Sequence, residues 1–223
     1  MEIKKFLKSH LALVIPYSVF LLFGIVTLVL YQKTDIHIFI NKLNSPFFDL
    51  FFKYMTEFGA FILIAPIIII QAFIRFRIAL IAVASSILAT VITQILKRVV
   101  WYDSPRPKVV FQDLYNLHLV ENVKLHSSHS FPSGHTAGAF ALFVVLALAN
   151  KRPVYQFFFL MMAVLVGYSR MYLSQHFMID VVVGSAVGTL SAFLCYFWLN
   201  NSRYAAKTSL DQPILQFLRS SKR

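Results

Sequence analysis

Six long runs without a single charged residue restrict this chain to a small set of possible folds. A helix needs roughly 20 apolar residues to cross the hydrocarbon core of a membrane, and three of the runs meet or approach that length. The shorter runs reach it when a few flanking polar residues lie in the interface. We therefore predict an all-α, polytopic membrane protein with six transmembrane helices. The runs are 11–32, 58–74, 78–96, 136–150, 153–169 and 181–202.

The composition argues against a water-soluble globular protein. Hydrophobic residues make up 58% of the 223 residues and charged residues only 13%, whereas a soluble domain carries about 25% charged residues. The formal net charge of +12 would by itself favour a nucleic-acid-binding protein. The basic residues, however, separate the apolar runs and do not cluster in one tail. We therefore expect a membrane, and no nucleic acid, as the partner.

The distribution of charge indicates how the predicted helices are oriented. The termini and the loops after the second and fourth helices carry 12 of the 21 Lys and Arg residues, with Glu2 and Asp211 as their only acidic residues. The opposite side carries nine basic and seven acidic residues. Positively charged loops stay in the cytoplasm. We thus expect both termini, including a basic tail at about 203–223, to be cytoplasmic, and we treat 1–223 as a single membrane-embedded domain.

A mixed apolar and charged segment follows the first run. Asn44, Ser45 and Pro46 supply an N-cap and a first-turn proline, which predicts an amphipathic helix in the outer interface. Two roles fit such a helix. It either covers the apolar surface of the bundle or guides a lipid sideways into a site.

The longest polar stretch is 97–135. Loops of this length inside compact proteins are usually functional or disordered. Its residues 118, 126 and 129 are histidines, but their spacing matches no metal-ligand pattern, so we expect no metal site. A role for His126 and His129 in recognising a headgroup is an open alternative, and the role of 108–131 is not determined by its sequence.

Ionisable residues next to the apolar runs gather at one side of the predicted bundle. Such groups are costly at membrane depth and therefore mark functional positions. They lie at the outer ends of helices three to six, and we expect these ends to meet. The residues are Lys97, Arg106, Pro132 to His135, Arg170, His176 and Asp180.

These residue types are suited to binding and attacking a phosphate group. Free N–H groups at a helix start and arginine side chains both bind tetrahedral oxyanions. His176 and Asp180 are four residues apart and so share one helix face. The carboxylate can orient one imidazole nitrogen and leave the other as a nucleophile. His135 supplies a second imidazole that can protonate the leaving oxygen.

Two segments resemble the second and third signature motifs of the type-2 phosphatidic acid phosphatase superfamily. One is Pro-Ser-Gly-His at 132–135, and the other is Ser169-Arg170 followed by His176 and Asp180. Together with the first motif the resemblance covers 97–180, and the six-helix layout is similar to the membrane members of the family.

The first motif of that family is a lysine, six residues and Arg-Pro. Here eight residues separate Lys97 from Arg106. An outward bulge at 102–104 would keep Lys97 in its position, and Arg98 is the alternative.

The resemblance implies hydrolysis of a phosphomonoester or pyrophosphate through a phosphohistidine, without a metal or other cofactor. It implies that His176 attacks phosphorus, Asp180 holds the imidazole, and His135 protonates the leaving group. The residues that it implies for binding the phosphate oxygens are Lys97, Arg106, Ser133, Gly134 and Arg170.

The leading hypothesis is an integral membrane lipid phosphatase of the bacterial inner membrane, with an extracytoplasmic active site. Its candidate substrates are a polyprenyl pyrophosphate, phosphatidylglycerol phosphate, phosphatidic acid and lipid A. The rival hypothesis is a noncatalytic lipid-phosphate binding or transport protein. Transporters commonly place their sites near the bilayer midplane, whereas the polar groups here lie on one side. The oligomeric state is left open.

Overall fold

The computed structural model describes residues 3–201 and 208–220. In these ranges the chain is helical and contains no strand, which confirms the predicted all-α class. The α-helices are α1 (Ile3–Ser9), α2 (Leu11–Leu30), α3 (Lys33–Lys42), α4 (Pro46–Met55), α5 (Phe61–Ile74), α6 (Phe76–Ile95), α7 (Pro107–Val110), α8 (Gly134–Leu148), α9 (Pro153–Tyr172), α10 (Met178–Asn201) and α11 (Ile214–Ser220).

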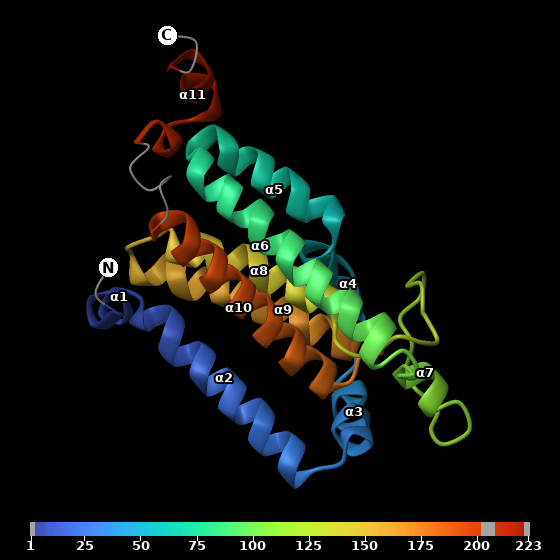
Figure 1. The fold of residues 1–223 in the computed structure, drawn as a ribbon. Coiled ribbons are helices and arrows are strands. Elements are labelled where there is room, and N and C mark those ends of the chain that lie inside the picture. The colour runs from blue at the N-terminus through green and yellow to red at the C-terminus, as the bar shows by residue number, and fades with distance from the viewer. Residues whose placement is uncertain (1–2, 202–207, 221–223) are drawn as a thin grey trace.

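The bundle is built around α8. Helices α6, α9 and α10 pack directly on it, while α2 lies along α9 and α10, and α5 packs on the outside of α6 (Figure 1). Most side chains of α8 are buried. Its position in the middle of the bundle explains why its sequence is apolar on every side.

Four helices are long and apolar enough to cross a membrane: α2, α6 with its extension to Val100, α9 and α10. Residues Pro46–Gly59 and Phe61–Ile74 together pass the same test but are bent by 57°, so the count is five if this pair is one span. The run 136–150 forms α8, whose 15 residues extend about 22 Å. This is shorter than the roughly 30 Å of a hydrocarbon core. The chain is thus a membrane protein with four or five candidate spans by length and composition.

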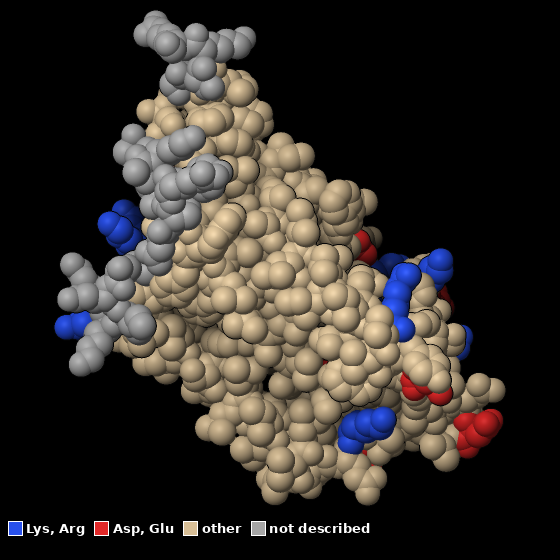
Figure 2. All heavy atoms as spheres, in the orientation of Figure 1, with Lys and Arg blue, Asp and Glu red and all other residues tan. Residues whose placement is uncertain are grey.

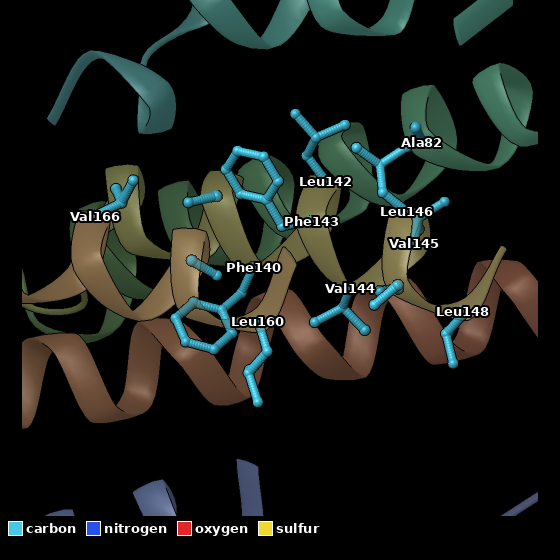
Figure 3. Packing of buried hydrophobic residues seen from close by; sticks show 14 of the residues in the cluster. Ala82, Phe140, Leu142, Phe143, Val144, Val145, Leu146, Leu148, Leu160 and Val166 are labelled. Atoms are coloured by element: carbon cyan, nitrogen blue, oxygen red, sulfur yellow. The ribbon is translucent and has the colours of Figure 1, made fainter. Parts of the chain in front are cut away.

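Buried aliphatic and aromatic side chains hold α8 to its neighbours. Phe140, Val144 and Leu148 of α8 belong to one cluster with Leu160 of α9 and Ala82 of α6 (Figure 3). All five side chains are almost fully buried. Each of the four larger side chains contributes roughly 1.5–3 kcal/mol when it leaves water, although lipid replaces water as the alternative environment along a spanning segment.

Glycines on α10 allow it to approach α8 closely. A Cβ atom at Gly188 would lie 2.3 Å from the carbonyl oxygen of Ala137, and one at Gly184 would lie 2.7 Å from that of Ser133. Small residues at such crossings let helix backbones approach each other. The first turns of α8 and α10, which carry His135 and Asp180, are consequently held side by side.

Charged residues lie at the two ends of the bundle. Figure 2 shows Lys and Arg at one end and a mixture of basic and acidic residues at the other, with a broad band free of both between them. We call the end with the α5–α6 and α8–α9 turns the terminal end. There the His10 imidazole Nε2 lies 3.2 Å from the Leu148 carbonyl oxygen, and Arg77 forms an ion pair with Asp211 at 2.9 Å. The opposite end, with residues 101–133 and 173–177, is called the loop end.

The segment after α2 begins a helix where the sequence predicts one. The Ser45 hydroxyl accepts a hydrogen bond from the Phe48 N–H at 3.3 Å, and Pro46 occupies the first turn. These contacts confirm the predicted N-cap and proline. Phe52 and Met55 are buried against the bundle, whereas Phe47 is 71% exposed, so α4 has one packed and one free apolar face.

Candidate active site

A cavity of about 720 Å³ opens at the loop end. It lies where the end of α6, the C-terminal end of α9, the start of α8 and the loop 101–133 come together. Its walls include most of the residues singled out in the sequence. The lining residues are Gln94, Lys97, Arg98, Arg106, residues 126–129, Gly134, His135, Arg170 and His176.

The carboxylate of Asp180 orients His176 from behind the cavity wall. Asp180 Oδ2 lies 3.2 Å from His176 Nδ1 and also accepts hydrogen bonds from the Ser130 hydroxyl at 2.5 Å and the Phe177 N–H at 3.0 Å. This contact favours the tautomer with its proton on Nδ1, because a carboxylate accepts from that nitrogen. The lone pair then lies on Nε2, which is 3.5 Å from Arg106 Nη1 at the cavity.

His176 is held in its neutral form. Its side chain is 2% exposed. Burial, followed by the positive charges of Arg170, Arg106 and Lys97, lowers the pKa of His176 well below its ordinary value of 6.5. A neutral imidazole has a free lone pair, so Nε2 can act as a nucleophile.

Arg106 reaches the cavity from the loop that begins after α6. Its Nη1 donates to the carbonyl and side-chain oxygens of Gln175 at 3.0 and 3.1 Å, and its Nε donates to the Ser128 carbonyl at 3.0 Å. Gln175 Nε2 in turn donates to the Lys124 carbonyl at 3.0 Å. These bonds fasten the loop to the residue that precedes His176, so the guanidinium and the imidazole are positioned together.

Arg170 at the end of α9 has an unsatisfied donor. Its Nη1 donates to Thr56 Oγ1 at 2.7 Å, whereas its Nε is buried without a hydrogen-bond partner in the described ranges. A buried unpaired donor in a native protein calls for an explanation such as an unseen ion. An anion bound in the cavity would supply the missing acceptor.

The segment with the two extra residues of the first motif contains a π-helix and an exposed turn. Residues 96–100 form a π-helix, and 101–103 form an exposed turn. π-Helical turns insert a residue into a helix and are frequent at functional sites. Lys97 lies in this π-helix, is 9% exposed, and donates from Nζ to the His129 carbonyl at 2.8 Å. Arg98 also lines the cavity but is exposed.

The first turn of α8 presents two of its expected residues to the cavity, but not Ser133. The Ser133 side chain is fully buried, and its hydroxyl caps the helix by accepting from the Thr136 N–H at 3.4 Å and the Thr136 hydroxyl at 2.8 Å. Gly134 and His135 line the cavity. A Cβ atom at Gly134 would meet no heavy atom within 4 Å, so the backbone there stays open to a ligand.

Three polar residues of the site were missed by the sequence reasoning. Ser130 donates to Asp180, Thr56 accepts from Arg170, and Gln175 holds Arg106. None belongs to a recognised motif. A small polar residue among the loop histidines was the one signal available for Ser130.

The loop histidines separate into two groups. His126 and His129 line the cavity, whereas His118 lies 2.9 Å from Asp49 on α4. Across residues 3–201 and 208–220, no group of three or more His, Cys, Asp or Glu side chains is arranged to hold a metal ion.

The fold and the cavity define an all-helical membrane protein with a buried histidine–aspartate pair facing several basic side chains. The chain belongs to the PAP2 superfamily, whose model matches residues 78–204. The resemblance noted in the sequence is thus confirmed at the level of the family.

Characterised relatives agree with this assignment. The lipid A 4'-phosphatase of Bacteroides thetaiotaomicron is 25% identical over 192 residues, which cover 81% of this chain and 82% of that protein. The crystal structure of Aquifex aeolicus LpxE matches with a TM-score of 0.66 and 27% identity over 74% of this chain and 94% of that one.

A second solved structure is the first transmembrane PAP2 type phosphatidylglycerolphosphate phosphatase from Bacillus subtilis. It matches with a TM-score of 0.64 and 25% identity over 85% of this chain and 98% of that one. The chain is accordingly a membrane lipid phosphatase, as its motifs predicted.

Proposed function

We propose that the chain cleaves a phosphomonoester or pyrophosphate of a lipid through a phosphohistidine at His176. The geometry of His176 is the observation that carries this proposal. Asp180 holds Nδ1 at 3.2 Å, and Nε2 faces a cavity lined by Arg106, Arg170 and Lys97. A phosphate bound among these cations would present its phosphorus to Nε2.

The reaction proceeds in two steps. The lone pair of His176 Nε2 forms a bond to phosphorus while the bond from phosphorus to the leaving oxygen breaks, and His135 gives a proton to that oxygen. Water then attacks the phosphoenzyme, His135 takes back a proton, and the N–P bond breaks to release inorganic phosphate. Positioning and charge stabilisation are the main requirements of phosphoryl transfer. Lys97, Arg106, Arg170 and the Gly134 N–H serve that purpose here, and Ser133 acts through the start of α8.

The substrate class is a lipid phosphate. The relatives include a lipid A 4'-phosphatase and a phosphatidylglycerolphosphate phosphatase. A polyprenyl pyrophosphate and phosphatidic acid also carry a phosphoryl group that the same chemistry could transfer. A noncatalytic lipid-phosphate carrier is the weaker alternative, because these relatives are named as enzymes and no observation on the cavity favours binding without turnover.

We further propose that the single domain crosses a bacterial inner membrane six times. In this topology the bent pair α4–α5 and the short α8 each count as a crossing, and α3 with the start of α4 lies in the outer interface. Both termini are then cytoplasmic, and the cavity opens outside near the headgroups. The charge distribution supports this orientation, because the loop end carries nearly balanced charges and the terminal end carries mostly basic ones.

Phosphate release from purified protein in detergent micelles tests the proposed chemistry. His176→Ala should lower turnover by a thousandfold or more, while its thermal unfolding stays close to that of the wild type. Rapid quenching into alkali after mixing with ³²P-labelled substrate should trap labelled wild-type protein. Wild-type turnover in His176→Ala would refute the mechanism, and loss of activity on all four candidate lipids after treatment with EDTA would refute its metal independence.

A further inference from the structure

A second cavity adjoins the proposed active site. Its volume is about 840 Å³, and its walls are formed by residues 108, 109, 111–117, 119 and 125–127. It shares His126 and Ser127 with the catalytic cavity, so the two spaces meet at those residues. Ligand sites commonly measure about 300–1,000 Å³. The proposed mechanism assigns no role to this space.

The inner wall of this loop cavity is anchored to the bundle. The Phe111 side chain is 2% exposed and its ring lies 5.4 Å from the His37 ring. Asn41 on α3 donates from Nδ2 to the His118 carbonyl at 2.8 Å, and its Oδ1 accepts from the His118 N–H at 2.9 Å. The loop is therefore tied to α3 at both Phe111 and His118.

Polar groups of the loop cavity are available to a ligand. The side chains of Gln112, Asp113 and Asn116 are exposed and have no hydrogen-bond partner from protein within the part of the chain that the structure describes. Tyr115 and several leucines supply apolar surface between them. Apolar walls with a few directed polar groups are typical of small-molecule sites.

The charge of the loop cavity differs from that of the catalytic cavity. Lys108 and Asp113 are its charged lining residues and balance each other. The catalytic cavity is lined by Lys97, Arg98, Arg106 and Arg170 without an acidic residue. The loop cavity is thus poorly suited to a second phosphate and better suited to an uncharged group with several hydroxyls, such as a sugar ring or a glycerol.

We infer that the loop cavity binds the hydroxyl-bearing part of the leaving group while its phosphate occupies the catalytic cavity. This inference rests on the proposed function and narrows its substrate class to lipid phosphates that carry a sugar or a free glycerol next to the phosphate. Amide side chains donate hydrogen bonds to hydroxyls and accept hydrogen bonds from them, whereas a carboxylate only accepts. The aromatic ring of Tyr115 packs against the C–H face of such a group. Residues 108–127 then determine specificity.

The test uses a double variant that removes hydrogen-bonding groups but retains volume, Gln112→Met with Asn116→Leu. Glu121→Gln, in the same loop but lining neither cavity, is the matched control. The substrates are phosphorylated lipid A and phosphatidylglycerol phosphate in mixed micelles. For whichever of these two lipids the wild type hydrolyses with the higher kcat/KM, the double variant should raise KM about tenfold. The inhibition constant of inorganic phosphate, which needs only the catalytic cavity, should stay within about twofold of the wild type.

Each other outcome overturns the inference. An unchanged KM shows that the loop cavity does not contact the substrate, and an equal rise of KM and of the phosphate inhibition constant shows only a structural effect on the loop. A wild-type enzyme that hydrolyses phosphatidic acid or polyprenyl pyrophosphate, but neither hydroxyl-bearing lipid, refutes the inference while leaving the proposed function intact. Failure of the wild type on all four lipids refutes the proposed function itself.

Discussion

At the scale of single residues, the site depends on how tightly Asp180 is held. Its Oδ2 accepts from Ser130 at 2.5 Å and from the Phe177 N–H at 3.0 Å, in addition to its contact with His176. A buried carboxylate with several donors keeps a fixed direction. In the proposed mechanism Ser130 would therefore act on the reaction through Asp180 and His176, as a positioning residue.

We expect Ser130→Ala to lower kcat about 10-fold to 100-fold, as is usual when a partner of a functional group is removed. KM should change little, because the phosphate-binding cations are untouched. Steady-state kinetics on one lipid phosphate measure both values. Ser130→Thr, which keeps the hydroxyl, should retain most activity, and Ser18→Ala on the exposed face of α2 serves as the control. A variant with unchanged kcat, or with KM altered as much as kcat, would contradict this role.

At the scale of helices, the closest contact is between α8 and α10. Gly188 is the tightest point, since its added Cβ would lie 2.3 Å from the Ala137 carbonyl oxygen and 2.7 Å from Phe140 Cβ. Backbone atoms cannot move aside as a flexible side chain can. The spacing of α8 and α10 is thus set by the absence of a side chain at this position.

Gly188→Ala should destabilise the protein by roughly 1–3 kcal/mol, which is usual for overpacking, and should lower the midpoint of thermal unfolding in detergent. Ala186→Val, on the exposed face of the same helix, is the matched control and should leave the midpoint nearly unchanged. If both variants unfold at the wild-type temperature, the close approach of α8 and α10 is wrong.

Helix α3 makes stability depend on pH. Burial lowers the pKa of His37 to about 4, and the Asp180 charge opposes this shift only in part. The unfolded chain takes up a proton near pH 6.5, whereas folded His37 does not until about pH 4. The contribution of His37 to the free energy of unfolding is therefore complete above pH 6.5. It is lost as the pH falls from there towards 4, by about 3 kcal/mol in total.

His37→Gln should flatten this dependence. The glutamine amide can replace the contact of His37 Nε2 with the Ser174 hydroxyl at 3.2 Å but does not titrate. Thermal unfolding at pH 7.5 and pH 4.5 should give a smaller difference for the variant than for the wild type. The lowered pKa of His176 affects both proteins alike. If the unfolding temperature changes equally between pH 7.5 and pH 4.5 in the variant and the wild type, His37 does not contribute to the pH dependence.

At the scale of the whole molecule, the charged ends of the bundle predict its orientation in the membrane. Glu121 lies at the loop end and Lys151 at the terminal end, and both are exposed. In the proposed topology they face opposite compartments, since a broad band without Lys, Arg, Asp or Glu separates the two ends on the face that Figure 2 shows.

Single-cysteine variants test this orientation in intact cells. Cys195 is the only cysteine of the chain, so Cys195→Ala provides the background for Glu121→Cys and Lys151→Cys. A membrane-impermeant maleimide should label Glu121→Cys in intact cells and Lys151→Cys only after permeabilisation. The reverse pattern would place the active site in the cytoplasm, and labelling of both before permeabilisation would rule out a bundle that spans the membrane.

Much of the architecture and chemistry is accessible from sequence because it depends on composition and on spacing between near neighbours. Apolar runs predict helices, Ser45 and Pro46 predict the start of α4, and the four-residue interval places His176 beside Asp180. The surroundings of the run 136–150 are different. An apolar segment has the same composition whether lipid or protein surrounds it, so sequence does not show that α8 is buried at the centre of the bundle.

Contacts between residues far apart in the sequence could be found only from the tertiary structure. Ser130 meets Asp180 across 50 positions, Arg106 meets Gln175 across 69, and Arg170 meets Thr56 across 114. Lys97 likewise meets the His129 carbonyl across 32 positions. Local patterns reflect the backbone and its neighbours within a turn or two, whereas these side chains meet only because helix packing brings their elements to one end of the molecule.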